Sequence, residues 1–207
     1  MLKSFDTGGY ALSMMDELKV QHLPLVDDGV YESLLSEKDL QAMPDPSAPV
    51  AGQTLFVPGI AEEGHLHEAI ARMSRYRLTL LPAVDKEGKY AGVITRERLV
   101  DAVAEGCNAE APGSVVMLEM WPQDYVLSDI ARIIEANNAH LLNLLHSIER
   151  DTGRLRITVK IDLADATPVI RSFERFDYTV LCHFMEKGMA DDVLLQRMDE
   201  LLYYMNM

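Results

Sequence analysis

The residues that most often perform chemistry are few in this chain and lie far apart. Among the six histidines only His65 and His67 are close in sequence, and the two cysteines form no Cys-x-x-Cys motif. Metal centres need ligands at short fixed spacings, and nucleophilic catalysis needs a base beside the nucleophile. No glycine-rich dinucleotide loop, P-loop, His-Glu-x-x-His or Gly-x-Ser-x-Gly motif is present. We therefore expect a protein that is not an enzyme and that has no metal site.

The net charge limits the partners of the chain. Its 33 acidic and 19 basic side chains give a formal net charge of −14 over 207 residues. Nucleic acids and anionic lipids attract clustered Lys and Arg, so an acidic surface argues against both. The N-terminus turns polar at Lys3 without the apolar stretch of a signal peptide, and no apolar run approaches the roughly 18 residues of a membrane span. We expect a cytoplasmic protein that binds neither nucleic acid nor membranes.

The elements that must position a site are duplicated in the first half of the chain. Sliding the chain along itself places 11–27 over 69–85, a displacement that we call the repeat shift, and one added residue in the second turn then places 30–36 over 89–95. Each copy predicts an amphipathic helix, an apolar strand, an Asp-Gly turn, a second strand, and a Ser or Thr that caps another helix. The predicted helix stripes are Leu12, Met15 and Leu18 in one copy and Ile70, Met73 and Tyr76 in the other. One copy is too small to bury its faces alone, so we expect the two to pack about a pseudo-twofold axis.

The order helix, h-h-P-h-V-D, turn, G-h-h-[ST]-x-x-D-h resembles the cystathionine-β-synthase (CBS) domain, which occurs in tandem as a Bateman module. The resemblance covers roughly residues 1–105 and implies a first CBS repeat over 1–45 and a second over 46–110. The Pro-rich residues 43–49 resemble the linker between the repeats. The expected fold class is α+β or α/β, with a tandem CBS pair.

This resemblance implies a cleft between the repeats that binds an adenosine-type ligand such as AMP, ADP, ATP or S-adenosylmethionine. In the family, the Asp of [ST]-x-x-D accepts from the ribose hydroxyls, while the Ser or Thr hydroxyl and the helix N-terminus favour the phosphate. Repeat one has this pair as Ser36 and Asp39, and repeat two has Thr95 but Arg98 in place of the Asp. His22 precedes Leu-Pro, a place from which family members reach the phosphate. The implied ligand-binding residues are Ser36, Asp39, His22, Thr95 and Arg98, with one functional site around Asp39.

Other interpretations of the same residues remain open. Ser36 and Thr95 are also ordinary helix caps, and Asp39 in a first helical turn stabilises the helix dipole without any ligand. Ser33 stands where the family usually has Gly, and its side chain could crowd a ligand. A set of arginines could neutralise phosphate or could simply form a solvated charged face: Arg72, Arg75, Arg77, Arg96 and Arg98.

The second half has a different order of elements. We predict strands at 115–120, 141–148, 157–163 and 178–184, with helices that use Leu127, Ile130, Ala131 and Ile134, and Val169, Ile170, Phe173 and Phe176. Residues 122–124 are expected to end the first strand and to cap the first helix. This βαββαβ order is ferredoxin-like. After a CBS pair, a domain over 114–186 resembles an ACT domain, and the combination is similar to CBS–ACT proteins of the acetoin-utilisation type.

ACT domains that bind amino acids use a Gly-containing loop after the first strand. Here that loop is residues 121–125, without Gly and with Asp124, which would repel a carboxylate. We therefore expect the ACT-like domain to mediate a homodimer, with Trp121 either an interface anchor or a core aromatic. Residues 188–207 are amphipathic at helical spacing and predict a C-terminal helix, which closes its own domain or packs on a partner subunit.

Two functions from different classes follow. The first is a non-catalytic regulatory protein that requires no cofactor and binds an adenine nucleotide or S-adenosylmethionine as a regulatory ligand. The alternative is a homo-oligomeric scaffold or interaction protein whose ligand sites are degenerate and empty. The sequence names no protein target.

Overall fold

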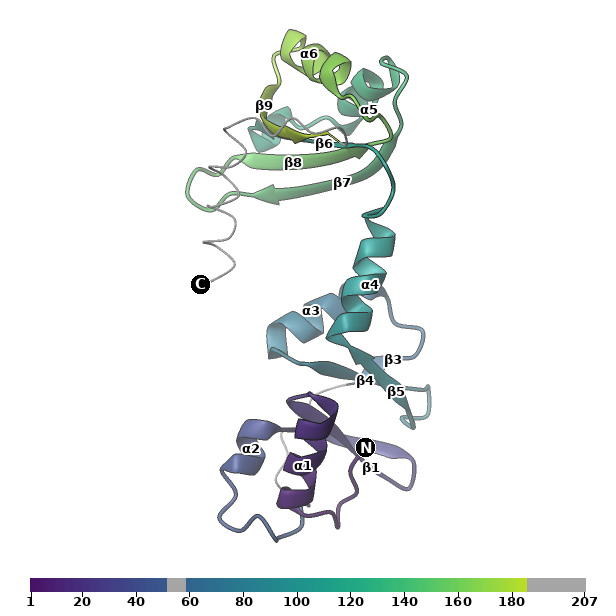
Figure 1. The fold of residues 1–207 in the computed structure, drawn as a ribbon, viewed down its shortest axis with the longest axis vertical. Coiled ribbons are helices and arrows are strands. Elements are labelled where there is room, and N and C mark those ends of the chain that lie inside the picture. Colours follow the sequence, from purple (N-terminus) through teal and green to yellow (C-terminus); the bar gives the residue numbers. More distant parts are fainter. Residues whose placement is uncertain (52–58, 186–207) are drawn as a thin grey trace. The chain divides into compact units, whose positions relative to one another are not determined.

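The computed structural model describes residues 1–51 and 59–185 and divides the chain into two compact units, Met1–Ala104 and Glu105–Met207. Both units combine helices and sheets, so the predicted α+β class is confirmed (Figure 1). Within the described residues, none of the helices combines the length and the apolar character needed to cross a bilayer.

The first repeat is built on a β-hairpin. After a single parallel bridge between Leu2 and Leu25 come α1 (Gly8–Leu18), β1 (His22–Asp27), β2 (Val30–Ser36) and the short α2 (Glu37–Gln41). Strands β1 and β2 pair antiparallel around an Asp-Gly turn in which Asp28 and Gly29 have positive φ. Such turns suit a tight hairpin because Gly and Asp tolerate this conformation.

The second repeat has the same order of elements. It consists of β3 (Ile60–Ala61), α3 (Leu66–Tyr76), β4 (Leu80–Val84), β5 (Tyr90–Thr95) and α4 (Arg96–Gly106). Strand β3 pairs parallel with β4 through Ile60 and Ala83, which the repeat shift matches to Leu2 and Leu25. The duplication therefore extends to a short edge strand that was not predicted from the sequence.

The two repeats meet through contacts that are themselves duplicated. The Tyr90 amide donates to the Gly29 carbonyl at 2.8 Å, and the Tyr31 amide donates to the Gly88 carbonyl at 3.4 Å. Tyr31 and Tyr90 are counterparts, as are Gly29 and Gly88, so exchanging the repeats exchanges the two bonds. An isolated antiparallel bridge between the counterparts Val30 and Lys89 lies between them. This reciprocity is the signature of the predicted pseudo-twofold axis.

The helix stripes predicted for the repeats are wrong in part. Met15 and Met73 are buried as expected, but the other buried positions nearby are the small residues Ala11 and Ala69, four residues earlier on the same face. Three larger apolar side chains of these helices are exposed: Leu18 and Tyr76 at the helix ends and Ile70 within α3. The prediction favoured large apolar side chains as the buried ones, but the packing leaves these side chains exposed to water.

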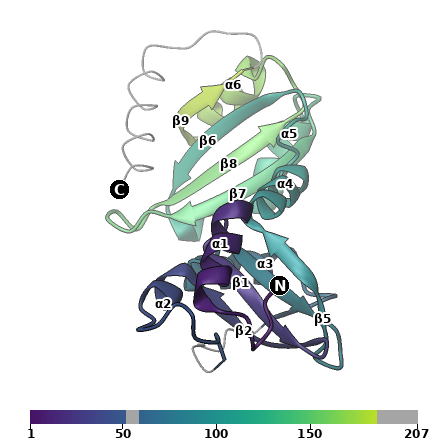
Figure 2. The same cartoon turned by 60° about the horizontal axis from the view of Figure 1, so that its bottom comes forward.

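The second unit is a four-stranded antiparallel sheet with the order β7-β8-β6-β9. Its elements are β6 (Ser114–Met120), the 3-10 helix η1 (Pro122–Asp124), α5 (Leu127–Glu135), β7 (Leu141–Ile148), β8 (Leu155–Ile161), α6 (Thr167–Arg175) and β9 (Thr179–Phe184). The first strand lies beside the third and the fourth, as in the predicted ferredoxin-like fold. Figure 2 shows the four strands side by side.

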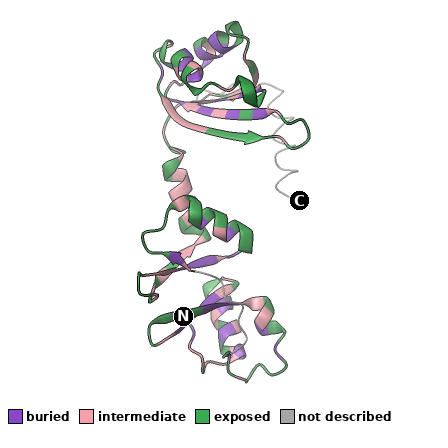
Figure 3. Ribbon diagram, turned by 180° about the vertical axis from the view of Figure 1, so that it is seen from behind, coloured by how far each residue is buried: buried purple, intermediate pink, exposed green. Residues whose placement is uncertain are grey.

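One face of this sheet forms the core of the second unit. Alternate residues of β6 and β8 are buried under α5 and α6, among them Val116, Leu118, Ile157 and Val159 (Figure 3). Three details of the helices differ from the sequence prediction. Leu127, predicted as part of the apolar stripe of α5, is exposed. Residues 122–124 form a separate 3-10 helix and do not cap α5, whose N-cap residue Val126 has no side-chain cap. Phe176 lies after the end of α6 and is exposed.

Two sequence predictions fall wholly or partly outside the described residues. The amphipathic segment 188–207 is one, and the part of the second repeat over 52–58 is the other. The division into domains at 1–45, 46–110 and 114–186 stays a prediction.

Candidate functional site

Ser36 and Asp39 lie together at the start of α2. Ser36 is the N-cap residue, and its Oγ accepts a hydrogen bond from the Asp39 amide at 3.1 Å. The same hydroxyl donates to Asp39 Oδ2 at 2.5 Å. The predicted cap is therefore present, and it holds the carboxylate of Asp39 in a fixed orientation while leaving both side chains partly exposed.

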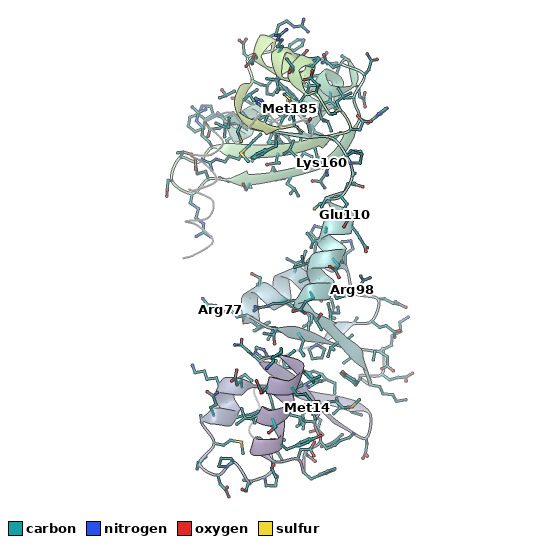
Figure 4. The ribbon with its side chains drawn as sticks, in the orientation of Figure 1. Met14, Arg77, Arg98, Glu110, Lys160 and Met185 are labelled. Atoms are coloured by element: carbon teal, nitrogen blue, oxygen red, sulfur yellow. The ribbon has the colours of Figure 1, made fainter. Side chains whose placement is uncertain are left out.

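Thr95 and Arg98 repeat this cap without the carboxylate. Thr95 Oγ1 accepts from the Arg98 amide at 3.2 Å at the start of α4, an eleven-residue helix. The Arg98 side chain is exposed on the first turn of α4 (Figure 4). The structure thus places an anion-favouring helix end at the second repeat, where the acceptor for hydroxyl donors is replaced by a cation.

His22 connects the two repeats. It begins β1 and is half-buried, and its Nδ1 lies 3.0 Å from Thr79 Oγ1 and accepts from the Thr79 amide at 3.3 Å. Thr79 Oγ1 also accepts from the Gln21 amide at 3.1 Å. Because an amide N–H points at Nδ1, this nitrogen carries no proton, and the neutral ring has its proton on Nε2.

The pKa of His22 agrees with this geometry. Burial lowers the pKa below its usual value, the positive charge of Arg96 lowers it further, and the negative charge of Asp39 opposes both. The charges of Asp39 and Arg96 therefore both reach the junction at which His22 bonds to Thr79. His22, Asp39 and Arg96 were identified from the sequence but Thr79 was missed. The repeat shift pairs Thr79 with Gln21, and the hydrogen bond between these counterparts places both near the axis.

Arg72 and Arg96 are engaged by protein acceptors. Arg72 donates to the Gly59 carbonyl and to Glu68 Oε1, each at 2.6 Å. Arg96 donates through Nε to the Leu78 carbonyl at 2.7 Å and through Nη2 to the Arg77 carbonyl at 3.4 Å. These carbonyls follow the C-terminal end of α3, where a cation is favourable. Figure 4 marks Arg77 just past α3 and Arg98 on α4.

Ser33 and its counterpart Gly92 differ in their surroundings. Ser33 is 3% exposed and pairs in the hairpin with the buried Leu25, and within the described residues its Oγ has no hydrogen-bond partner. A Cβ placed on Gly92 would meet no atom within 4 Å. The extra side chain of the first repeat is thus packed into protein, while the same position of the second repeat borders open space.

The contacts described above do not form a metal site. In the parts of the chain that the structure describes, no three His, Cys, Asp or Glu side chains lie together as a metal-binding group. His65 Nδ1 caps α3 by accepting from the His67 amide at 3.2 Å, so the His-x-His pair belongs to a helix terminus.

Comparisons with known proteins find one family model and several solved structures that are similar to parts of this chain. The family model of the CBS domain matches residues 57–105, which contain most of the second repeat. Three solved structures are similar to parts of this chain. A CBS domain pair/ACT domain protein of Thermotoga maritima is 20% identical, with 51% of this chain and 88% of that chain covered and a TM-score of 0.47.

The other two have similar values. A protein of Vibrio cholerae described as an acetoin utilization protein (AcuB) is 24% identical, with 51% and 82% of the two chains covered and a TM-score of 0.45. CBSX2, a protein of Arabidopsis thaliana, in complex with AMP is 25% identical, with 51% and 87% covered and a TM-score of 0.46. The family match thus falls on the part of the chain that contains α3, β4, β5 and most of α4.

Proposed function

We propose that the first unit is a tandem CBS pair that binds an adenosine-type ligand between its repeats, and that the protein is regulatory and not catalytic. The observation that carries this proposal is the position of Asp39. Its carboxylate is oriented by Ser36 and acts electrostatically on His22, which is bonded to Thr79 of the other repeat. A hydroxyl-accepting group therefore lies within electrostatic range of the junction of the two repeats.

The surrounding groups suit the remaining parts of such a ligand. A carboxylate accepts two hydroxyl donors at once, which fits the adjacent hydroxyls of a ribose. The N-terminus of α4, capped by Thr95 and carrying Arg98 in its first turn, favours a phosphate or another anion. Neutral His22 supplies a hydrogen-bond donor at Nε2 and adds no charge. AMP, ADP, ATP and S-adenosylmethionine share the adenosine portion, and no further cofactor is needed for binding.

The second unit is proposed to be an ACT-like domain that forms a homodimer, in an arrangement of the acetoin-utilisation type. Strand β7 is an edge of the sheet, eight residues long, and exposes Leu145 at 54% and Ile148 at 61%. Within the described residues β7 pairs with no strand other than β8, and such a partly apolar edge strand is a template for pairing with another chain. The net charge of −14 disfavours nucleic acid and anionic lipid as partners.

A thermal-shift panel tests the ligand proposal. AMP, ADP, ATP, S-adenosylmethionine and, as a nucleotide of different shape, NADH are each added at millimolar concentration to the full chain. We expect at least one adenosine ligand to raise the melting temperature, because a ligand that binds only the folded state stabilises it. A panel without any shift contradicts the proposal.

The matched variants are Asp39→Ala and Asp16→Ala. Asp16 is also an aspartate of the first repeat, but it lies exposed on α1 in an ion pair with Lys19. Loss of a charge-assisted hydrogen bond costs about 1.5–3 kcal/mol, so Asp39→Ala should weaken binding roughly tenfold or more. Asp16→Ala should bind as the unchanged protein does. Equal affinity of the two variants would show that Asp39 does not hold the ribose.

An empty scaffold is the second candidate. Ser36 and Asp39 satisfy each other by hydrogen bonds, Ser33 replaces the usual Gly of the family, and Arg98 replaces the second Asp. If this candidate holds, no member of the ligand panel shifts the melting temperature, while light scattering still finds a homo-oligomer.

A further inference from the structure

A pocket in the second unit is independent of the proposed nucleotide site. Its volume is about 310 Å³, near the lower end of the size of small-molecule sites. Three connections contribute to it: the segment after β6 with Trp121 and Asp124, the segment between α6 and β9 with Phe176 and Asp177, and the start of β8 with Arg154 beside it. Elements distant in sequence thus form one concave surface.

Two exposed aromatic rings belong to this pocket. Trp121 is 44% exposed and Phe176 is 52% exposed, although aromatic rings gain most when they are covered. Each ring already faces a guanidinium of its own chain, with Arg154 at 4.6 Å from the Trp121 ring and Arg175 at 5.4 Å from the Phe176 ring. Both distances fall within the range of cation–π attraction. Both rings therefore already take part in cation–π contacts within the chain.

The charges around the rings have the complementary sign. The lining carries three carboxylates, Glu119, Asp124 and Asp177, against the single guanidinium of Arg154. Arg154 lies 3.7 Å from Glu119, so this pair accounts for one charge of each sign. The carboxylates of Asp124 and Asp177 remain, each close in sequence to one of the rings, and the Arg175 guanidinium at the Phe176 ring offsets one of them, so the balance stays negative. A carboxylate ligand would meet net repulsion there, whereas an ammonium or guanidinium would meet attraction.

We propose that this pocket binds an alkyl ammonium or alkyl guanidinium group, with the cation between the carboxylates of Asp124 and Asp177 and its alkyl stem on the rings of Trp121 and Phe176. Such a group is carried by small amines and by basic peptide side chains. The pocket volume favours the small amine.

The single tryptophan of the chain makes this proposal directly measurable, since Trp121 is the only source of indole fluorescence. Agmatine, which carries a guanidinium and an ammonium, is titrated into the full chain at low salt. We expect its emission to change with a dissociation constant of about 1 mM, because several exposed charge and cation–π contacts of about 0.5–1 kcal/mol each act together. The affinity should fall when sodium chloride is raised, since exposed charges are screened.

Three other probes identify the chemistry and its source. Acetyl-Gly-Arg-Gly-amide carries the same guanidinium on a peptide, and its citrulline analogue has the same shape without the charge. Succinate tests for an anion. Tighter binding of the arginine peptide than of agmatine would assign the cation to a peptide. Equal binding of the citrulline peptide, binding of succinate alone, or an unchanged emission up to 10-fold above the expected dissociation constant would overturn the proposal.

Isosteric variants locate the site. Asp124→Asn and Asp177→Asn each remove one charge, and Asn tolerates the positive φ of Asp177. Each should weaken agmatine binding about two- to fivefold, the range of an exposed ion pair. Glu135→Gln, an exposed carboxylate at the end of α5 outside the pocket, is the matched control and should bind normally. If Glu135→Gln weakens binding as much as the pocket variants, the attraction is a general effect of the acidic surface and the assigned site is wrong.

Discussion

The two repeats of the first unit have the same order of elements but bury their counterpart side chains to different extents. Leu34 in β2 is 3% exposed, and its counterpart Val93 in β5 is 39% exposed. Leu40 in α2 is buried, whereas α4 has no buried residue. The same backbone plan therefore coexists with a closed first repeat and a more open second one.

Part of the reason lies in the segment after α2. Met43 and Val50 join the core of the first repeat, and the Gly9 amide donates to the Pro46 carbonyl at 2.8 Å. The chain thus turns back over α1 and covers the repeat it has just left. The duplicated pattern therefore determines the order of strands and helices. Segments outside the pattern contribute to how deeply each copy is buried.

The largest test of this difference is a pair of core truncations. Leu35 is fully buried, and Leu35→Ala should lower the free energy of unfolding by about 2–5 kcal/mol, the usual cost of such a cavity. Its counterpart Ile94 is only half-buried, so Ile94→Ala should cost about 1–2 kcal/mol. Urea unfolding followed by far-UV circular dichroism measures both. Equal losses would mean that the second repeat is as well covered in solution as the first.

A smaller effect is expected at Ser33, the buried counterpart of Gly92. Ser33→Ala removes a buried hydroxyl that has no partner among the described residues. Because the variant no longer has to desolvate this hydroxyl on folding, its free energy of unfolding should rise by about 1 kcal/mol. Ser147→Ala changes an exposed strand residue and serves as the control, with little expected change. A loss of stability in Ser33→Ala would indicate that the hydroxyl makes a useful bond in solution.

The weakest expected effect is a pH dependence at His22. Because burial lowers the pKa of His22 in the folded chain below its usual 6.5, the unfolded chain takes up a proton first as the pH falls. His22 therefore contributes stability above about pH 6.5 that is lost progressively toward acid. His22→Gln should flatten the fall of the melting temperature between about pH 7 and pH 5. His67→Gln alters an exposed ring and serves as the control, with no expected change in the slope of melting temperature against pH. If this variant flattens the slope as well, the pH dependence cannot be assigned to His22.

Much of this architecture is readable from the sequence because it rests on repeated or alternating patterns. The hairpins, the caps at Ser36 and Thr95, and the alternation of β8 each have several residues that point to the same structure. The edge contacts of Leu2 and Ile60 were missed because one or two residues have no periodicity. They too are matched by the repeat shift, so an alignment extended to the N-terminus contains the signal.

The candidate sites were less predictable for a different reason. Ser36 and Asp39 are three residues apart, so their contact is a local property of a helix start. Thr79 reaches His22 only through the packing of two repeats, and the pocket of Trp121 and Phe176 assembles three distant connections. Contacts between residues so far apart in sequence depend on tertiary packing. The pattern of residues along the chain does not show which distant elements will pack together.

The contact of Gln21 and His22 with Thr79 has a consequence for how the chain can change over generations. In a symmetric pair of separate, identical subunits, a residue on the axis always meets its own copy, so every substitution there occurs twice. Joining the copies in one polypeptide removes this constraint, because Gln21 and Thr79 are encoded separately. The hydroxyl of Thr79 can then accept from the backbone amide of Gln21 and lie beside the imidazole of His22, with no second hydroxyl required at position 21. Covalent fusion thereby permits the two halves to differ, with a carboxylate at Asp39 in one and a guanidinium at the matching Arg98 in the other.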